Sequence, residues 1–288
     1  PEQSASGKTT FCATNGYTFP SVTLNGMGDR TMNKQRENLK ILLLQIRDDE
    51  TTRQEELAEF VRFSQLDPAQ FTVLDVFKTP AFAPTCMDGY DALFVGGSSD
   101  ASVTKPEQYP FVEPSKQLIR HCLQANIPVF ASCFGFQVAV EALGGKVVVD
   151  QPNMEMGTYP LWLTEAAATD PLFHDLPNGF WAVSGHKERA IAMPETAILL
   201  AYSDRCPYHA FKIQAKPFYG FQFHPEVDAA DLVARITRYQ TRYLDGAAHL
   251  DQILADLQDT PLANQLIAKF VDRILLGNTA FATSQETV

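Results

Sequence analysis

Short apolar runs, separated by amphipathic segments, dominate residues 40–145 of the chain. The series begins with KILLLQIRDD at 40–49 and continues with FTVLDVF (71–77), DALFVGG (91–97) and PVFASC (128–133). Each run is short and rich in branched or aromatic residues, which is typical of strands buried on both faces of a sheet. We therefore expect a strand at each of these positions.

Segments with helical features lie between these runs. Thr52 with Glu55 forms the pattern of a capping box, and apolar residues recur at helical spacing after it. Residues 114–128 predict a second helix that opens on a proline, and residues 136–145 predict a third. Alternation of strand and helix with short connections indicates a mostly parallel sheet, in which ligands bind at the carboxyl ends of the strands.

The pattern changes after the glycine pair that ends the third helix. Strand-like runs with fewer helices follow at 146–150, 159–164, 180–186, 197–203, 209–214 and 218–224, and helical spacing returns at 228–244, 249–257 and 260–277. The sequence thus predicts an α/β fold of the flavodoxin-like kind. It has three layers, with a mostly parallel sheet, helices on both faces, a small antiparallel sheet and C-terminal helices.

The chain divides into three segments that differ in composition and in apolar pattern. Residues 1–38 are rich in Ser, Thr, Asn and Gly without a sustained apolar period, so we expect a disordered tail or a remnant of expression. Residues 39–227 form the expected main domain. Residues 228–288 form an expected helical extension that packs on it.

Charge and composition argue against several classes of partner and binding site. The formal net charge is −11 and no basic stretch is interleaved with aromatic residues, which argues against a nucleic-acid partner. No apolar run approaches the roughly 20 residues that span a bilayer, so we expect no membrane partner. Cysteines stand at 12, 86, 122, 133 and 206, without a CxxC pair or metal-like spacing to histidine. We expect free thiols in the cytoplasm, no metal site and no cofactor.

Cys133 stands at the end of a predicted buried strand, directly before small residues and a helix. A nucleophile in this position is exposed at the top of the sheet while its neighbours are packed. The helix start presents free backbone N–H groups and a partial positive charge, which stabilise a thiolate and can hold an oxyanion. The alternative is a buried core thiol, since free cysteine is among the most buried residue types.

A base for this thiol is found in YGFQFHPE at 219–226. Pro225 ends the predicted strand, so that His224 and Glu226 leave the same strand end. The carboxylate can then hold one ring nitrogen while the other faces the thiol. We expect activity to fall below about pH 6–7, where a free imidazole protonates. The alternative is a histidine and a glutamate that cap a surface loop.

Gly96 and Gly97 directly follow another predicted strand. A residue without a side chain lets a backbone N–H approach a ligand closely, as an oxyanion hole requires. A glycine pair alone more often marks a simple turn. Three strand ends that carry Gly-Gly, Cys and His-Pro-Glu in this order are together much stronger evidence for a catalytic site than the glycine pair alone.

With ASCFGFQ at 131–137 and FQFHPE at 221–226, the chain resembles the class I glutamine amidotransferases of the triad type, and it is similar to the amidotransferase domains of GMP synthetases. The resemblance covers roughly residues 40–227. It implies that Cys133 attacks the glutamine side-chain amide, giving a γ-glutamyl thioester and ammonia. His224 would act as base and then as acid, and Glu226 would orient it.

The same resemblance implies further site residues. The backbone N–H groups of Gly97 and Phe134 would form the oxyanion hole, and the substrate would be held by Gly96, Gln137, His186, Lys187 and Glu188. His186 as a structural loop residue is the alternative for that position. The chain departs from the family at Ala131, where glycine is usual, and at Phe136.

Three functions remain open. The first is a stand-alone glutaminase that delivers ammonia to a synthetase partner, since about sixty residues after Val227 are too few for a synthetase domain. The second is a γ-glutamyl peptidase or hydrolase, which lets water finish the reaction on a γ-glutamyl peptide or conjugate. The third is a non-catalytic regulatory or binding protein with the same fold.

Overall fold

The computed structural model describes residues 35–239 and 247–278. The strands are β1 (Ile41–Ile46), β2 (Phe71–Asp75), β3 (Ala92–Ser98), β4 (Val129–Ser132), β5 (Lys146–Val149), β6 (Glu155–Leu163), β7 (Phe180–His186), β8 (Glu188–Ala192), β9 (Ala197–Tyr202), β10 (Ala210–Ile213) and β11 (Phe218–Phe221). The helices are α1 (Glu50–Ser64), α2 (Val112–Ala125), α3 (Phe134–Ala142), α4 (Ala229–Arg238), α6 (Ala247–Asp256), α7 (Pro261–Lys269) and the π-helical η6 (Phe270–Leu275). Most of the predicted tail, residues 1–34, lies outside the described residues.

Across the two described ranges, the main sheet has nine strands in the order β2-β1-β3-β4-β11-β10-β9-β6-β7. The strands from β2 to β11 in this order run parallel, and the strands from β10 to β7 continue the sheet with antiparallel pairing. A separate antiparallel pair joins β5 and β8. The parallel part has the flavodoxin-like order, so the fold class predicted from the sequence is confirmed.

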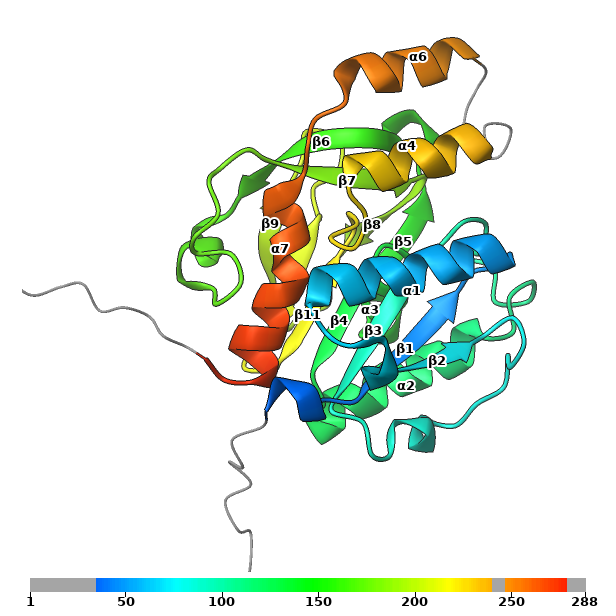
Figure 1. Ribbon diagram of the computed structural model, residues 1–288, viewed down its shortest axis with the longest axis vertical. Helices are drawn as coiled ribbons and strands as arrows, with labels where there is room; N and C mark the ends of the chain where they lie inside the picture. The colour runs from blue at the N-terminus through cyan, green and yellow to red at the C-terminus, as the bar shows by residue number, and fades with distance from the viewer. Residues whose placement is uncertain (1–34, 240–246, 279–288) are drawn as a thin grey trace, which may run out of the picture. The chain divides into compact units, whose positions relative to one another are not determined.

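Alternate residues of the parallel strands face two different cores. In β1, Ile41 and Leu43 belong to one buried cluster while Leu42 and Leu44 belong to the other. The first cluster packs beneath α1 and α7, and the second packs beneath α2 and α3. In Figure 1, α1 and α7 accordingly lie in front of the strands and α2 and α3 behind them. This double burial explains why these strands read as continuous apolar runs.

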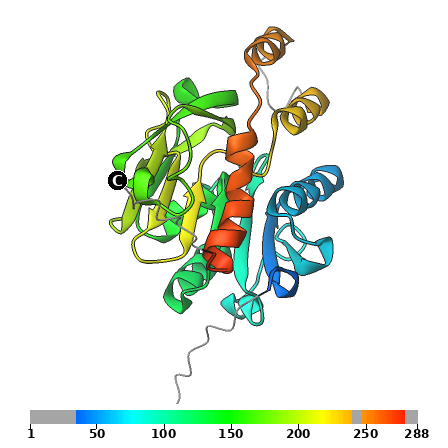
Figure 2. The ribbon, with the colours of Figure 1, turned by 60° about the vertical axis from the view of Figure 1, so that its left-hand side comes forward.

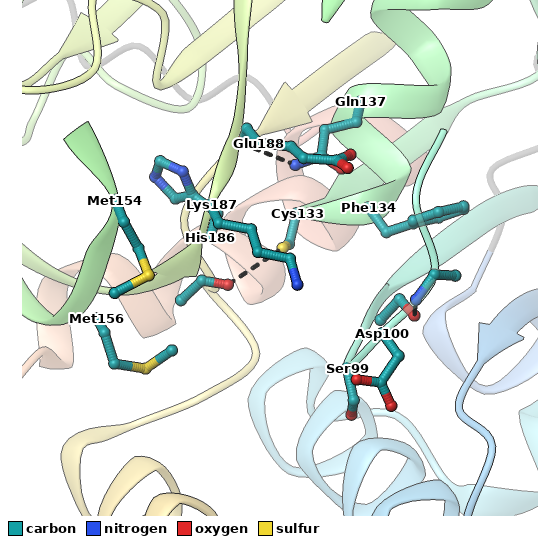
Figure 3. Close-up of a pocket in the computed structure, with 13 residues that line it drawn as sticks. Ser99, Asp100, Cys133, Phe134, Gln137, Met154, Met156, His186, Lys187 and Glu188 are labelled. Carbon is teal, nitrogen blue, oxygen red and sulfur yellow. Dashed lines mark hydrogen bonds between the residues drawn. The ribbon is translucent and has the colours of Figure 1, made fainter. Parts of the chain in front are cut away.

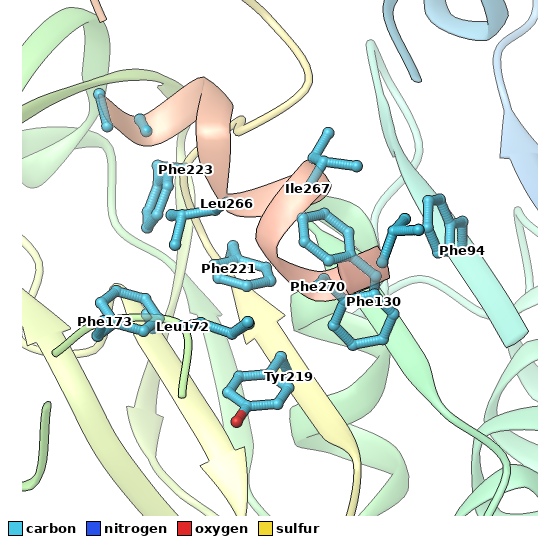
Figure 4. Packing of buried hydrophobic residues seen from close by; sticks show 14 of the residues in the cluster. Phe94, Phe130, Leu172, Phe173, Tyr219, Phe221, Phe223, Leu266, Ile267 and Phe270 are labelled. Carbon is cyan, nitrogen blue, oxygen red and sulfur yellow. The ribbon is translucent and has the colours of Figure 1, made fainter. Parts of the chain in front are cut away.

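The helix α7 is part of the first cluster. It lies beside α1, and Figure 2 shows it running along the sheet. Figure 4 shows Leu266 and Ile267 of α7, and Phe270 just after it, against Phe130 and Phe221 of the strands. All of these side chains are fully buried. The C-terminal helices therefore complete the core. The exact domain boundaries at 38/39 and 227/228 remain predictions.

Several local predictions are wrong in detail. The N-cap of α1 is Asp49, whose side chain accepts from the Thr52 backbone N–H at 2.8 Å, so the predicted Thr52–Glu55 capping box does not form. The strand β11 ends at Phe221, three residues before His224. The strand β8 was not predicted, because its sequence ERAIA lacks a continuous apolar run.

Two further observations concern the described residues as a whole. Cysteines 86, 122, 133 and 206 are free thiols, as expected, while Cys12 lies outside the described residues. None of the helices in the described ranges combines the length and the apolar character that crossing a membrane requires.

Candidate active site

Cys133 occupies a strained turn between β4 and α3. Its backbone angles are φ 48° and ψ −102°, a region that residues with a β-carbon rarely adopt. Two hydrogen bonds fix the turn: the Cys133 N–H donates to Phe221 O at 2.7 Å, and the Gln137 N–H donates to Cys133 O at 3.1 Å. The side chain is nearly buried, and its sulfur lies 3.9 Å from Gly185 O. The strand-end elbow predicted from the sequence is present.

The other two predicted catalytic side chains meet beside this sulfur. His224 Nδ1 lies 2.7 Å from Glu226 Oε1, and the Ser132 hydroxyl donates to the same oxygen at 2.9 Å. Although His224 lies beyond β11, its backbone N–H donates to Val183 O at 2.8 Å, which holds it against β7. Because Nδ1 is engaged by Glu226, Nε2 is the nitrogen available to the Cys133 sulfur.

In this cluster, His224 and Glu226 each stabilise the charged form of the other. Burial by itself would lower the pKa of the His224 imidazole, but the interactions with Cys133 and Glu226 outweigh it and raise this pKa to about 10. Burial would raise the pKa of the Glu226 carboxyl, yet His224 and Ser132 together hold it below its ordinary value. These contacts favour the imidazolium form of His224. The direction of this pKa change is upward from the value of a free imidazole, while the loss of activity expected below about pH 6–7 stays a prediction.

The C-terminal helix α7 holds the chain segment that carries His224 and Glu226. The side-chain amide of Asn264 donates to Pro225 O and to Val227 O, each at 2.9 Å, and Asn264 is itself buried. No sequence motif marks this asparagine, because its contact spans about forty residues of the chain. A residue that looks like part of a packing helix thus fixes the backbone that carries His224 and Glu226.

The side chains of Glu56 and Arg47 lie very close to the glycine pair, Gly96 and Gly97. A β-carbon at Gly96 would lie 2.5 Å from Glu56 Oε1, and one at Gly97 would lie 2.8 Å from both the Arg47 guanidinium and the His224 ring. A side chain at either position would therefore displace these groups. The Gly97 N–H, expected in the oxyanion hole, donates to Glu56 Oε1 at 3.1 Å. Glu56 is fully buried and also accepts from Arg47 Nε at 2.9 Å.

A cavity of about 600 Å³, including the space open to solvent, lies in front of Cys133. Its lining comprises residues 98–101, Cys133, Phe134, Gln137, Met154, Met156 and residues 185–188. Figure 3 shows the methionines on one side of the sulfur and Ser99 with Asp100 on the other. Phe134 is the first residue of α3, where a backbone N–H has no acceptor within the helix. It can therefore donate into the cavity.

The predicted substrate residues occupy different places around this cavity. Gln137 is buried, and its amide donates to Glu188 O at 3.0 Å. Lys187 lines the cavity, and burial raises the pKa of the Glu188 carboxyl, which lines it too. Gly96 is not among the lining residues in the part of the chain that is described; it packs on Glu56 instead.

His186 is the last residue of β7 and so lies in a strand rather than in a loop, and its part in binding substrate stays a prediction. Its Nε2 lies 3.0 Å from Glu155 Oε2, and His209 Nε2 lies 2.8 Å from the same oxygen. The Ser203 hydroxyl donates to Glu155 Oε1 at 2.6 Å. Burial would raise the pKa of the Glu155 carboxyl, but its two histidine neighbours hold it well below the ordinary range. Burial also lowers the pKa of His186 itself.

Several residues around this site were not identified from the sequence. Arg47 directly follows β1, and the rule that ligands bind at strand ends could have pointed to it. Ser132 precedes the nucleophile and could have been noted in the same way. Glu56 and Glu155 carry no local signal, because their roles depend on contacts with strands far away in the sequence.

Comparison with known proteins gives this site a context. The sequence profile of the class I glutamine amidotransferases matches residues 68–238. A protein from Methanocaldococcus jannaschii, named as one subunit of the glutamine-hydrolyzing GMP synthase, is 36% identical over 118 residues, which are 41% of this chain and 61% of that protein. The protein of the same name from Methanococcus aeolicus is 30% identical over 129 residues, 45% of this chain and 66% of the relative. The matches thus span somewhat less than two thirds of these relatives.

Solved structures agree on the fold. A glutamine amidotransferase from Thermotoga maritima superposes with a TM-score of 0.65 at 20% identity, covering 83% of this chain and 98% of that one. A glutamine amidotransferase from Methylobacillus flagellatus gives 0.62 at 17% identity, covering 82% and 94%. At these identities the likeness concerns the fold alone. Because the family profile matches more than half of the chain, this protein belongs to the class I glutamine amidotransferase family.

Proposed function

We propose that this protein hydrolyses the side-chain amide of glutamine to glutamate and ammonia, with Cys133 as nucleophile. One observation supports this most strongly. The His224 imidazole is held by a buried carboxylate on one nitrogen and interacts with the Cys133 thiol, and the sulfur opens on a cavity lined with charged groups. This is the arrangement of orienting group, base and nucleophile that acyl transfer requires.

In the first half of the reaction, the Cys133 thiolate attacks the amide carbon, and the carbonyl electrons move to the oxygen. His224 enters this step as an imidazolium, since its raised pKa keeps it charged at neutral pH. It donates its Nε2 proton to the amide nitrogen as the C–N bond breaks. Ammonia leaves, and a γ-glutamyl thioester remains on Cys133.

In the second half, water replaces ammonia. The neutral His224 takes a proton from the water as its oxygen attacks the thioester carbon. When the intermediate collapses, the C–S bond breaks, the sulfur leaves as a thiolate and glutamate is released. Glu226 stays ionised throughout and holds the ring in the tautomer that both steps use. The thiolate and the imidazolium are restored together.

The oxyanion of both intermediates needs backbone donors. The Phe134 N–H is our first candidate, because it lies at the start of α3 beside the sulfur. The Gly97 N–H is the second, and it must turn away from Glu56 Oε1 to reach the oxyanion. Rotation of this one peptide would complete the hole when substrate is bound, and the absence of a side chain at Gly97 allows it.

Recognition of free glutamine requires opposite charges for its two ends. We propose that Lys187 pairs with the α-carboxylate, and that Glu188 accepts from the α-ammonium, since both line the cavity. Gln137 fixes the Glu188 backbone through its hydrogen bond, and His186 supports the same strand end from its contact with Glu155. Met154 and Met156 would cover the aliphatic part of the substrate.

The use of the ammonia follows from the relatives. Two proteins of similar sequence are named as subunits of glutamine-hydrolyzing GMP synthases, so we propose that a separate synthetase protein accepts the ammonia. Ammonia release should then rise when the correct partner is added. A γ-glutamyl peptidase, in contrast, would show no such response.

The decisive experiment measures the acyl-enzyme directly. The protein is mixed with glutamine or with a γ-glutamyl dipeptide, quenched in acid and examined by intact mass spectrometry, while released ammonia is assayed in parallel. We expect a γ-glutamyl adduct on Cys133 and ammonia from glutamine. Cys133→Ser should abolish both, whereas Cys122→Ser, at a buried thiol of α2, should change neither.

Two outcomes would contradict the proposal. If neither substrate forms an adduct and a γ-glutamyl chloroketone leaves Cys133 unlabelled, Cys133 is not the nucleophile. If the dipeptide is turned over with a kcat/KM far above that of glutamine, the chain is a γ-glutamyl peptidase that shares the same chemistry.

A further inference from the structure

A second cluster of ligand-type side chains lies beside the active-site cavity, and glutamine hydrolysis makes no direct use of most of it. His186 ends β7, Cys206 lies in the connection between β9 and β10, and His209 directly precedes β10. One ligand atom from each lies within 4.8 Å of the other two. All three residues are buried, with Cys206 and His209 fully so. Glu155, at the start of β6, reaches the same point.

The hydrogen bonding of this cluster is incomplete. Glu155 Oε2 lies 3.0 Å from His186 Nε2 and 2.8 Å from His209 Nε2, and only the contact with His186 has the geometry of a hydrogen bond. Neither ring nitrogen of His209 makes a hydrogen bond within the described residues, although the side chain is fully buried and Nε2 lies close to Glu155 Oε2. Buried polar atoms nearly always have a partner. A buried imidazole without a hydrogen bond, beside a thiol, a second imidazole and a carboxylate, forms a group of donors that lacks an acceptor of electron pairs.

These donor types match one class of ligand. Thiolate, imidazole and carboxylate together are the ligands of Zn²⁺, whereas Mg²⁺ and Ca²⁺ prefer oxygen alone. Zinc with ligands at about 2.0–2.3 Å in tetrahedral geometry places its ligand atoms roughly 3.3–3.8 Å apart. The three ligand atoms lie within 4.8 Å of one another, and Glu155 Oε2 lies 3.0 and 2.8 Å from the two histidine nitrogens, so the cluster is near that spacing.

We propose that His186, Cys206 and His209, with Glu155 as the fourth ligand, bind a single divalent transition-metal ion of the Zn²⁺ type. Binding forms a metal–sulfur bond, and the Cys206 thiol releases its proton to solvent. His186 also lines the active-site cavity, which gives the ion a path to a cluster that is otherwise closed.

This site would act on the active site through β7. His186 is the neighbour of Gly185, whose carbonyl lies 3.9 Å from the Cys133 sulfur. It is also the neighbour of Lys187, which lines the cavity. An ion that fixes the His186 ring would therefore fix the strand end that borders both the nucleophile and the substrate.

The test uses the full chain with Cys133→Ser, because the active-site thiol is itself a possible zinc ligand. Metal-free protein is titrated with Zn²⁺ in competition with a chromophoric chelator, and separately with Co²⁺, whose bond to a thiolate gives a near-ultraviolet charge-transfer band. We expect one ion per chain and the thiolate band. Thermal unfolding should shift upward with Zn²⁺, since a ligand that binds the folded state stabilises it.

Variants then identify the ligands. Cys206→Ser and His209→Gln, each added to Cys133→Ser, should weaken Zn²⁺ binding by more than about 100-fold, since changes to outer-shell partners alone cost about 10–100-fold. Cys122→Ser removes a buried thiol of α2 and is the matched control, with unchanged affinity expected. The Co²⁺ spectrum of the parent requires no additional variant, so it decides even where a substitution impairs folding.

The proposal is overturned if the parent binds no stoichiometric Zn²⁺, or if Co²⁺ binds without a thiolate band. It is also overturned if Cys206→Ser and His209→Gln bind Zn²⁺ as tightly as the parent does. In either case the cluster is a hydrogen-bonded network around Glu155. These readouts measure metal binding in a chain without the nucleophile, so they stand apart from the proposed glutaminase activity.

Discussion

Glu226→Gln tests how the buried carboxylate prepares the His224 imidazole. The substitution keeps the volume of the side chain but removes a charge that lies 2.7 Å from His224 Nδ1, in a fully buried position. A hydrogen bond to a charged group contributes about 1.5–3 kcal/mol. Since about 1.36 kcal/mol corresponds to one pH unit, the pKa of His224 should fall by roughly one to two pH units.

The sign follows from which form Glu226 stabilises. The carboxylate favours the imidazolium, so its loss lets the ring deprotonate at lower pH. The parent should keep the imidazolium up to the raised His224 pKa of about 10, and the alkaline limb of kcat/KM should lie there. In the variant this limb moves toward neutrality. Because an amide in place of Glu226 can also hold the wrong tautomer, we expect kcat to fall by about 10²–10⁴-fold, the usual contribution of general acid–base catalysis.

The assay is steady-state ammonia release from glutamine over about pH 5–11, with circular dichroism to verify folding. Ser132→Ala is the matched control, because it removes the neutral donor to the same Glu226 oxygen without removing the charge. A neutral hydrogen bond contributes about 0.5–1.5 kcal/mol, so kcat should fall by about tenfold or less with the alkaline limb nearly unmoved. If Glu226→Gln keeps kcat within about threefold of the parent and leaves the pH profile unchanged, the carboxylate does not orient the base.

The remaining predictions concern stability and geometry. Burial raises the pKa of Glu59 to about 7, so the folded chain binds its proton more tightly than the unfolded chain, and the stability that this proton contributes below about pH 4.5 should be lost as the pH rises to 7. Glu59→Gln should flatten that part of the curve of thermal midpoint against pH, and a curve identical to the parent's would contradict this. Gly97→Ala should lower kcat at least about tenfold, because its β-carbon would lie 2.8 Å from the proposed catalytic imidazole, and a kcat equal to the parent's would contradict this. Asn264→Ala should cost about 1–3 kcal/mol in the free energy of unfolding, measured in urea, and should lower kcat, because it leaves two carbonyls of the active-site segment without donors. The exposed neighbour Gln265→Ala should change neither quantity, and equal effects of the two variants would argue against a positioning role.

The raised pKa of His224 shows how tertiary contacts alter a prediction that is sound for an isolated group. From the sequence, a histidine near a cysteine is expected to titrate near neutrality. In the fold, Glu226 and Cys133 both surround the ring, and their combined effect exceeds the cost of its burial. The sequence identifies the pair of residues, but their distances and burial set the direction of the pKa change.

The placement of His224 is a second example. The run FYGFQFH predicts a strand that reaches the histidine, yet β11 ends at Phe221. The last apolar residue of the run is still buried, because Phe223 packs beside Phe180 and Phe221 in the core. Apolar character predicted burial correctly, and it could not distinguish a strand from an irregular segment that packs equally well.

The sequence by itself determined the α/β class, the places along the chain of the buried parallel strands, and the elbow at Cys133. These are local properties, since burial on both faces fixes a continuous apolar run and a tight turn demands small residues. Only the tertiary structure decided that Glu56 engages the Gly97 N–H and that Asn264 fixes the His224 segment. Only it brought His186 of β7 beside Cys206 and His209, which are themselves three residues apart in the sequence. Such contacts join elements that are distant along the chain, and no spacing within the sequence encodes which strand ends and helices become neighbours when the sheet assembles.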